Sequence, residues 1–142
     1  MSRIQLIQAM ATSVSFQKTT EDVKAILEPR YESMEKYYLL GDMEKLMNFY
    51  HPDAMVIDNG INVAYTRNEI KMVFKKYFDK YGTVGFEISD AEYLGCDDHL
   101  VYHCKCLIPS SETNVEKVKI TSIWKCCKGD WLIYYEEYAS DE

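Results

Sequence analysis

The sequence lacks several features that would assign a function directly. No apolar run approaches the roughly 20 residues that span a bilayer, and Gln5 and Gln8 interrupt the only apolar stretch near the N-terminus. Neither a membrane-spanning segment nor a secretory signal is therefore expected. A glycine-rich phosphate loop, a Ser-His-Asp grouping and the histidine spacing of a metal site are also missing. These absences remove the common signatures of phosphate binding, nucleophilic catalysis and histidine-based metal binding.

Basic residues are the scarcer kind of charge in this chain. Sixteen lysines and arginines stand against 23 aspartates and glutamates, which gives a formal net charge of −7. That balance opposes phosphate backbones and anionic lipid surfaces, so no nucleic acid and no membrane partner is expected. Residues 1–20 contain no acid, as in mitochondrial presequences, but they have few basic residues. We therefore expect a cytoplasmic protein and leave import into an organelle open.

The five cysteines lack the even number and the spacing of a disulfide framework. We expect all of them to be reduced, with no metal and no cofactor bound. Alternation along the predicted strands turns Cys104, Cys106 and Cys126 toward the core and leaves Cys96 and Cys127 more accessible. A structural zinc at Cys104 and Cys106 is the alternative, but the expected strand pairing places Cys126 several residues away from both thiols.

Residues 1–19 read as an N-terminal arm, and residues 20–142 as one domain of a usual size for a single core. Hydroxyl and acidic side chains at 19–22 are helix-start signals. Beyond them, because proline removes a backbone donor, Pro29 predicts a kink or a late start. Apolar residues at steps of three and four predict that this helix buries one face, formed by Leu27, Tyr31, Met34 and Tyr38.

Two more helices and a strand are expected before residue 82. A short second helix covers residues 43–50 and is stopped by His51-Pro52. A brief strand at 54–58 and an Asn59-Gly60 turn come next. The clearest helical pattern of the chain follows, with an apolar face formed by Ile70, Val73, Phe74, Tyr77, Phe78 and Tyr81.

The rest of the chain reads as strand. Four segments are separated by short polar stretches, roughly at 84–94, 99–109, 115–127 and 131–139. Helices followed by a meander of long strands predict an α+β fold in which the helices pack on one face of a bent sheet. Alternation along the last three strands turns one set of side chains toward the helices: Leu100, Tyr102, Cys104, Cys106, Ile108, Val118, Ile120, Ser122, Trp124, Cys126, Leu132, Tyr134, Glu136 and Tyr138.

Three groups of residues occur in a recognisable order: Gly41-Asp42-Met43-Glu44-Lys45-Leu46 leading to Tyr50-His51-Pro52-Asp53-Ala54, then Thr66-Arg67-Asn68-Glu69-Ile70, then Trp124 with Gly129-Asp130-Trp131-Leu132-Ile133. Over about residues 21–139 the chain resembles the nuclear transport factor 2-like superfamily, which includes ketosteroid isomerases and SnoaL-type polyketide cyclases. The resemblance implies a cone-shaped, cystatin-like fold. In such a fold three N-terminal helices pack on a curved, mainly antiparallel sheet and enclose a pocket. Function in this superfamily is dispersed and must be argued from the site.

The resemblance puts Asp58 at the position of the general base in ketosteroid isomerases. It also puts Met34 and Phe74 where those enzymes have an oxyanion-hole tyrosine and a supporting tyrosine, and Ser122 where they have a protonated aspartic acid. Met34 and Phe74 cannot donate a hydrogen bond to a developing enolate. Steroid-type isomerisation is therefore not expected, and Asp58 reads equally well as an acid that caps the turn after its strand.

The third helix departs from the resemblance at one position. Many relatives begin this helix with glycine, whereas this chain has Thr66. Because threonine is a competent N-cap, we expect the substitution to be tolerated there.

Three classes of function remain open. An enzyme of the SnoaL or isomerase type would use Asp58 and Glu136 for proton transfer, and a non-catalytic protein would serve as a dimerisation or adaptor domain. A filled interior favours the adaptor, and an open interior with a desolvated carboxylate favours the enzyme. The leading expectation is a dimeric pocket protein that binds a small apolar or amphipathic ligand through Met34, Tyr38, Tyr50, Phe74, Tyr102, Ser122, Trp124, Tyr134 and Tyr138.

Glu136 carries the most specific expectation. Strand parity turns it inward beside Ser122, where a carboxylate must find hydrogen-bond donors, meet a cation or rise in pKa. We expect Glu136 to be buried, hydrogen-bonded to at least one hydroxyl and raised in pKa, with Asp58 at the pocket mouth. A one-residue shift of the hairpin would instead place Glu136 in solvent and Tyr135 inside.

The opposite face of the predicted sheet is unusually apolar. A wholly solvated surface would not carry so many large side chains, so this outer face predicts a homodimer interface. The residues concerned are Val101, Leu107, Ile123, Trp131, Ile133 and Tyr135.

Overall fold

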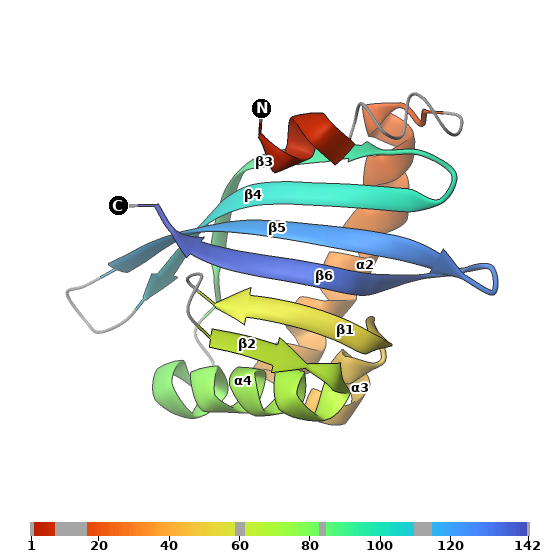
Figure 1. Cartoon of the computed structure of the whole chain (residues 1–142). Helices are drawn as coiled ribbons and strands as arrows, with labels where there is room; N and C mark the ends of the chain where they lie inside the picture. The colour runs from red at the N-terminus through yellow and green to blue at the C-terminus, as the bar shows by residue number, and fades with distance from the viewer. Residues whose placement is uncertain (1, 8–16, 59–61, 83–84, 110–114, 142) are drawn as a thin grey trace.

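Helices lie against one face of a curved sheet in the computed structural model of the chain (Figure 1). In chain order the elements are α2 (Thr20–Leu39), α3 (Met43–Met47), β1 (Tyr50–Asp58), β2 (Asn62–Tyr65), α4 (Thr66–Tyr81), β3 (Glu87–Gly95), β4 (His99–Pro109), β5 (Val115–Cys127) and β6 (Asp130–Ser140). The structure describes residues 2–7, 17–58, 62–82, 85–109 and 115–141. No helix in these ranges is long and apolar enough to cross a membrane.

The sheet has six strands in the order β2-β1-β6-β5-β4-β3. Only the β1–β6 pair is parallel, and the other four neighbouring pairs are antiparallel. Helices α2, α3 and α4 cover one face of this unclosed sheet, so the predicted α+β, cystatin-like architecture is confirmed. All four strands expected after the third helix are present.

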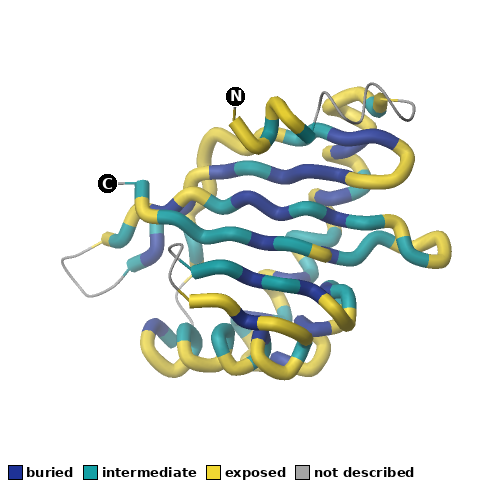
Figure 2. The backbone as a smooth tube through the Cα atoms, viewed as in Figure 1, coloured by how far each residue is buried: buried dark blue, intermediate teal, exposed yellow. Residues whose placement is uncertain are grey.

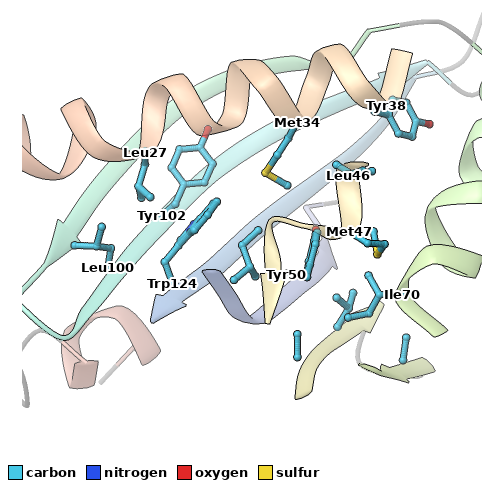
Figure 3. Close-up of a cluster of buried hydrophobic side chains, with 14 of the residues drawn as sticks. Leu27, Met34, Tyr38, Leu46, Met47, Tyr50, Ile70, Leu100, Tyr102 and Trp124 are labelled. Atoms are coloured by element: carbon cyan, nitrogen blue, oxygen red, sulfur yellow. The ribbon is translucent and has the colours of Figure 1, made fainter. Parts of the chain in front are cut away.

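Most of the core lies between the helices and the sheet. The strands β4, β5 and β6 alternate buried and more exposed residues along their length (Figure 2). Trp124, Tyr50 and Leu27 are among the largest fully buried side chains. Figure 3 shows how residues from α2, α3, α4 and the strands meet in one cluster, which gives the interior its aromatic and sulfur-rich character.

Helix α2 corrects one prediction made from Pro29. The helix runs without interruption over Thr20–Leu39 with the proline inside it, so it does not start late. Proline lacks the amide donor that would bind the carbonyl oxygen of Ala25, four residues earlier. The side chain of Arg30 donates a hydrogen bond to the carbonyl oxygen of Ile26 at 2.6 Å, which supplies a donor in that turn.

Strand β1 begins earlier than predicted. The second helix ends at Met47, and Tyr50 and Pro52 belong to the strand rather than to a helix end. The long-range pairing of β1 with β6 outweighs the local helical pattern at Tyr50. The proline is accommodated because the β1–β6 register shifts between Tyr50 and Met55, where ladder hydrogen bonds are interrupted.

Strand β2 was not predicted. Its four residues pair antiparallel with β1, and three of them are exposed, so the segment shows no useful alternation. The turn expected at Asn59-Gly60 lies outside the described residues. The polar connection between β4 and β5, at 110–114, lies outside them as well.

The interpretation of Thr66 as an N-cap is wrong. The N-cap of α4 is Tyr65, and no side chain caps this end of the helix. The φ angle of Thr66 is 69°, in the left-handed region that glycine enters freely and β-branched residues avoid. The position therefore requires a positive φ rather than a capping hydroxyl, a conformation that glycine adopts most readily.

The β5–β6 hairpin contains a bulge that the sequence prediction missed. Next to the turn, Trp124 pairs with Ile133 instead of Tyr134. The register shifts at this point, so Tyr134 is the extra residue of β6. As a result Ile133 is fully buried, whereas Tyr134 is 42% exposed. The inward orientation predicted for Tyr134 is therefore wrong. The inward orientation predicted for Leu132 is wrong as well, because Leu132 pairs with Lys125.

Beyond the bulge the hairpin follows the predicted register. Ser122 pairs with Glu136, and both are buried. A hairpin that kept the register of its turn would place Tyr135 opposite Ser122 and turn Glu136 outward. The bulge is therefore what brings Glu136 into the interior.

All five cysteines are free thiols, as predicted. Cys104 and Cys106 are buried, also as predicted. The other expectations fail at Cys126 and Cys96. Cys126 is exposed because it lies next to the hairpin turn, and Cys96 is buried because Gln17 pairs with its backbone.

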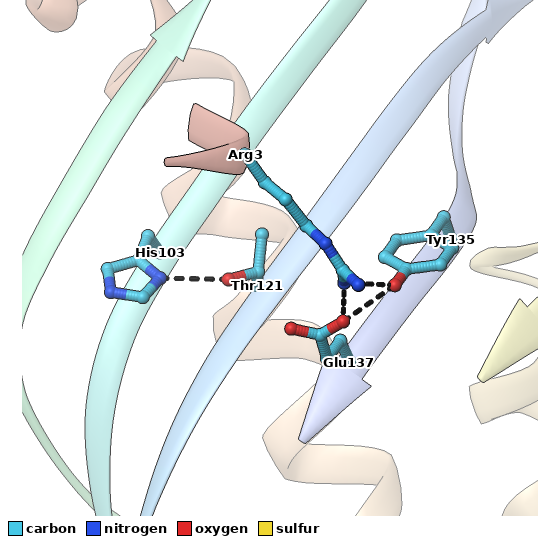
Figure 4. Close-up of polar contacts among 5 residues, drawn as sticks. All are labelled: Arg3, His103, Thr121, Tyr135 and Glu137. Atoms are coloured by element: carbon cyan, nitrogen blue, oxygen red, sulfur yellow. Dashed lines mark hydrogen bonds and ion pairs between the residues drawn. The ribbon is translucent and has the colours of Figure 1, made fainter. Parts of the chain in front are cut away.

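The outer sheet face is less exposed than the sequence suggested. Ile133 points to the core, and Val101 is only 1% exposed although it belongs to neither core cluster. The short helix at residues 3–7 lies on the outer side of the sheet, near β3 and β4 (Figure 1). Its Arg3 donates to the Tyr135 hydroxyl at 2.6 Å and pairs with Glu137 (Figure 4).

Candidate functional site

A cavity of about 160 Å³ lies between the helices and the inner face of the sheet. Engineered apolar cavities of about 150 Å³ hold a benzene-sized molecule, so this one is large enough for a one-ring compound. Aliphatic, methionine and cysteine side chains form part of its wall. Two glutamates, Glu35 and Glu136, also line it. The remaining wall residues are aromatic: Tyr31, Tyr38, Tyr50, Phe74, Tyr77, Phe86, Tyr102 and Tyr138.

Glu136 contributes a carboxyl group to this cavity and is only 2% exposed. Its Oε1 accepts hydrogen bonds from the hydroxyls of Tyr50 and Tyr138, each at 2.6 Å. Its Oε2 accepts one from the Ser122 hydroxyl at 2.6 Å. The three donors come from β1, β5 and β6, so the position of the carboxyl group depends on the pairing of all three strands.

Burial dominates the electrostatics of this cluster. Removal from water raises the pKa of Glu136 above its usual value, and the hydrogen bonds from Ser122, Tyr138 and Tyr50 oppose that rise. Burial and then the nearby charge of Glu136 raise the pKa of Tyr50, Tyr138 and Tyr31 well above the usual value. The tyrosines therefore remain hydrogen-bond donors, while the carboxyl group takes up a proton more readily than an exposed one.

Tyr38 is the second polar feature of the cavity wall. The residue is 3% exposed, and its hydroxyl has no hydrogen-bond partner among the described residues. The rings of Phe74, Phe78 and Phe86 surround it with centroid separations of 5.1–6.4 Å. Burial raises the pKa of Tyr38 to about 12, so the hydroxyl stays protonated. A buried donor without a partner is costly unless something else in the cavity pairs with it.

Asp58 lies beside the cavity rather than in its wall. It ends β1, opposite Tyr138 of β6, and is half-buried. The hydroxyl of Tyr77, a wall residue, is 3.4 Å from each carboxylate oxygen of Asp58. Two wall residues, Glu35 and Ile88, are exposed and mark the side on which the cavity meets solvent.

The structure brings most of the predicted pocket residues together. Glu136 has the burial, the hydroxyl partners and the raised pKa that were predicted for it. Ser122 and Trp124 are buried outside the cavity wall, and Tyr134 lies on the other face, where it contacts His51 at a centroid distance of 5.3 Å. The wall includes Met34, Tyr38, Tyr50, Phe74, Tyr102, Glu136 and Tyr138.

Several wall residues were not among the predicted site. Tyr31 and Tyr77 belong to the apolar stripes of α2 and α4, so the same periodicity could have identified them. Tyr31 also accepts a hydrogen bond from the indole nitrogen of Trp124 at 3.0 Å. Its ring packs against that of Tyr102, with the two ring centroids 4.2 Å apart. Phe86 precedes β3, although the predicted strand at 84–94 included it, and it was missed because faces were assigned only along the last three strands.

A metal centre is not built by the described part of the chain. No group of three or more histidine, cysteine, aspartate or glutamate side chains is placed there to hold an ion. Burial raises the pKa of Cys104 to about 11 and that of Cys106 to about 12, so both wall thiols stay protonated. The polar chemistry of the cavity therefore depends on carboxyl and hydroxyl groups.

Sequence comparison identifies one family. The profile described as "SnoaL-like domain" matches residues 23–138, which include every cavity residue named above. No curated protein matches the chain in sequence.

Solved structures agree on the fold at low sequence identity. A protein of unknown function with a cystatin-like fold from Nostoc punctiforme has a TM-score of 0.69 at 14% identity, covering 83% of this chain and 90% of that one. A nuclear transport factor 2-like protein from Novosphingobium aromaticivorans has a TM-score of 0.72 at 12% identity, covering 85% and 83%. A protein of this fold provisionally named a dehydratase, from Streptomyces avermitilis, has a TM-score of 0.70 at 12% identity, covering 86% and 98%.

Proposed function

The chain belongs to the SnoaL-like domain family, and from this premise we propose that it binds a small, largely apolar molecule in its cavity and exchanges a proton with it through Glu136. The cavity has the size and the aromatic wall of a small-molecule site. An adaptor with no ligand would have no need for such a space, because protein interiors are otherwise close-packed.

The observation that carries the proposal is the buried carboxyl group. Glu136 is 2% exposed, contributes to the cavity wall, and has its pKa raised mainly by burial. A carboxyl group whose pKa is raised by burial takes up a proton more readily than an exposed one and can return it, which is what acid–base catalysis requires. Asp58 is the less suitable group because it is not in the cavity wall.

The three hydroxyl donors would keep the carboxyl group in place during proton exchange. Tyr50 and Tyr138 bind one oxygen and Ser122 binds the other. When Glu136 accepts a proton, one of these hydroxyls can rotate and become the acceptor, since each hydroxyl both donates and accepts. Tyr38 adds an unpaired donor in the same cavity, which a carbonyl, hydroxyl or amine group of the ligand could use.

Methyl NMR tests the binding part of the proposal. Neutral and charged one-ring aromatic compounds are titrated into the full chain, and the methyl signals of Val73, Ile108, Val118 and Ile120 from the cavity wall are followed. We expect saturable shifts there and little change at Leu100, which is buried elsewhere. A Val118→Trp variant fills the cavity and should abolish the shifts while the Leu100 signal stays native-like. If no compound of the panel moves the wall methyls, the proposal is wrong.

Mass spectrometry addresses the identity of the natural ligand. The native protein and the Val118→Trp variant are purified in parallel, and their bound compounds are extracted. A compound that follows the native protein and is missing from the filled variant is bound in the cavity. A compound present in both preparations is bound elsewhere.

A further inference from the structure

Every charge in the cavity wall is negative. The two ionisable acids of the wall are Glu35 and Glu136, and the wall contains no lysine, arginine or histidine. All 16 lysines and arginines and all three histidines of the sequence fall within the described residues, so none is hidden in an undescribed segment. The carboxylate of Glu136 is therefore held by hydroxyl dipoles alone, without a countercharge in the wall.

Aromatic faces form much of the surface that a ligand would touch. Eight of the 19 wall residues are tyrosine or phenylalanine. The face of an aromatic ring attracts a cation within about 6 Å, and the attraction grows when the cation is removed from water. Opposite charges also attract more strongly in the low dielectric of a protein interior than in water. An aromatic wall with one buried carboxylate therefore favours positive charge over neutral or negative groups of the same shape.

We propose that the cavity takes a small organic cation, an ammonium group on a compact apolar body, whose positive head lies among the aromatic faces and is balanced by the Glu136 carboxylate. The inference rests on the proposed function because it concerns the same cavity. It also implies that anionic molecules such as carboxylates and phosphate esters are excluded, since they would be buried against Glu136 with no basic partner.

A pair of isosteric probes separates charge from shape. Phenyltrimethylammonium and tert-butylbenzene differ in charge but share one ring and one compact head group. Isothermal titration of the full chain, at a series of pH values up to mildly alkaline, gives the affinity of each. We expect the cation to bind about tenfold more tightly or better, as one favourable cation–π contact and one charge pair would provide.

Variants then identify which groups recognise the charge. Glu136→Gln keeps the size of the side chain and should remove most of the preference for the cation. Phe74→Leu replaces an aromatic face by an aliphatic one and should reduce the same ratio of affinities, and it keeps the test available if Glu136→Gln folds poorly. Glu92→Gln is the matched control, because this exposed acid on β3 lies opposite His103, away from the cavity wall, and should leave the ratio unchanged.

The outcomes distinguish the two proposals. If tert-butylbenzene binds as tightly as the cation or more tightly, the cavity does not select charge, and this inference is overturned while the proposed function stands. If neither probe binds, both proposals fall. A preference for the cation that survives in Glu136→Gln and in Phe74→Leu also overturns the inference, because the charge would then be recognised somewhere else.

Discussion

Tyr38 and Tyr50 are both buried tyrosines of the cavity wall, but their hydroxyls are in opposite situations. The Tyr50 hydroxyl donates to Glu136 at 2.6 Å, whereas the Tyr38 hydroxyl has no partner among the described residues. A buried donor without a partner costs about 1–3 kcal/mol, and removing the donor recovers part of that cost. The two residues therefore allow a matched pair of substitutions.

Tyr38→Phe should raise the free energy of unfolding of the ligand-free protein by about 1 kcal/mol, because it removes an unsatisfied donor and keeps the ring. Tyr50→Phe should lower it by about 1–2 kcal/mol, because a buried carboxyl group loses one of its hydrogen bonds. Urea unfolding of both variants measures these changes. Equal losses in the two variants would show that the Tyr38 hydroxyl is satisfied after all.

The pKa of Glu136 also predicts how stability depends on pH. The folded-state pKa is raised above its unfolded value, so between these two values the folded protein binds more protons than the unfolded chain. The contribution of Glu136 to stability is therefore complete at acid pH and is lost as the pH rises through the folded-state pKa.

Glu136→Gln removes this titration, so the stability of the variant relative to the wild type should increase as the pH rises from below the usual carboxyl pKa to neutrality. Urea unfolding at a series of pH values measures the difference. The exposed-acid variant Glu92→Gln should follow the wild type throughout. A difference between Glu136→Gln and the wild type that does not change with pH would contradict the raised pKa.

At the scale of elements, the sequence predicted what local periodicity controls. The third helix and the last three strands were correct because each shows a clear apolar pattern over many residues. Tyr50 was misassigned because a local helical pattern competed with pairing to β6, a contact distant in sequence. Strand β2 was missed in the prediction because its four mostly exposed residues show no alternation.

The residues of the candidate site could be predicted where side chains alternate regularly between the two faces of a strand. Parity turned Glu136 and Tyr138 inward correctly, and it failed at Tyr134 because the bulge there is not encoded by any turn residue in the sequence. Tyr134 and Ile133 exchange faces as a consequence. The wall residue Phe86 was missed because faces were assigned only along the last three strands.

The start of α4 gives an element-scale prediction. Thr66 has a φ of 69°, which costs a β-branched residue of the order of 1 kcal/mol and costs glycine little. Thr66→Gly should therefore raise the melting temperature, corresponding to about 0.5–1 kcal/mol. Thr66→Ala keeps a Cβ at the same φ and should gain less. Thermal unfolding compares the three proteins, and a loss of stability in Thr66→Gly would mean that the threonine side chain has a role in the helix start.

At the scale of the whole molecule, the homodimer remains a prediction. Val101 and Ile133 no longer support it because they are buried within the chain. Trp131 no longer supports it either, because it packs against the main core cluster. Leu107 and Ile123 are half-buried and keep part of the outer face apolar. The N-terminal arm, predicted as residues 1–19, contributes the helix at 3–7 that lies on this same side of the sheet.

Light scattering at micromolar concentration should give twice the mass of the 16.6 kDa chain. Ile123→Glu places a charge on the outer face of β5 and should give a folded monomer. Glu92→Gln, which keeps that patch intact, should remain a dimer. A monomeric mass for the native protein at every concentration would contradict the predicted interface.

The central claim is that Glu136 is a proton-transferring group in a cavity open to small molecules. Ring opening of 5-nitrobenzisoxazole tests it directly, because this reaction needs a base to remove one carbon-bound proton while the nitrogen–oxygen bond breaks, and the phenolate product is coloured. We expect saturable catalysis whose rate rises with pH through an apparent pKa above that of an exposed carboxyl group. Catalysis should be lost in Glu136→Gln and kept in Asp58→Asn. A rate that is unchanged in Glu136→Gln, or that is lost in Asp58→Asn instead, would contradict the account.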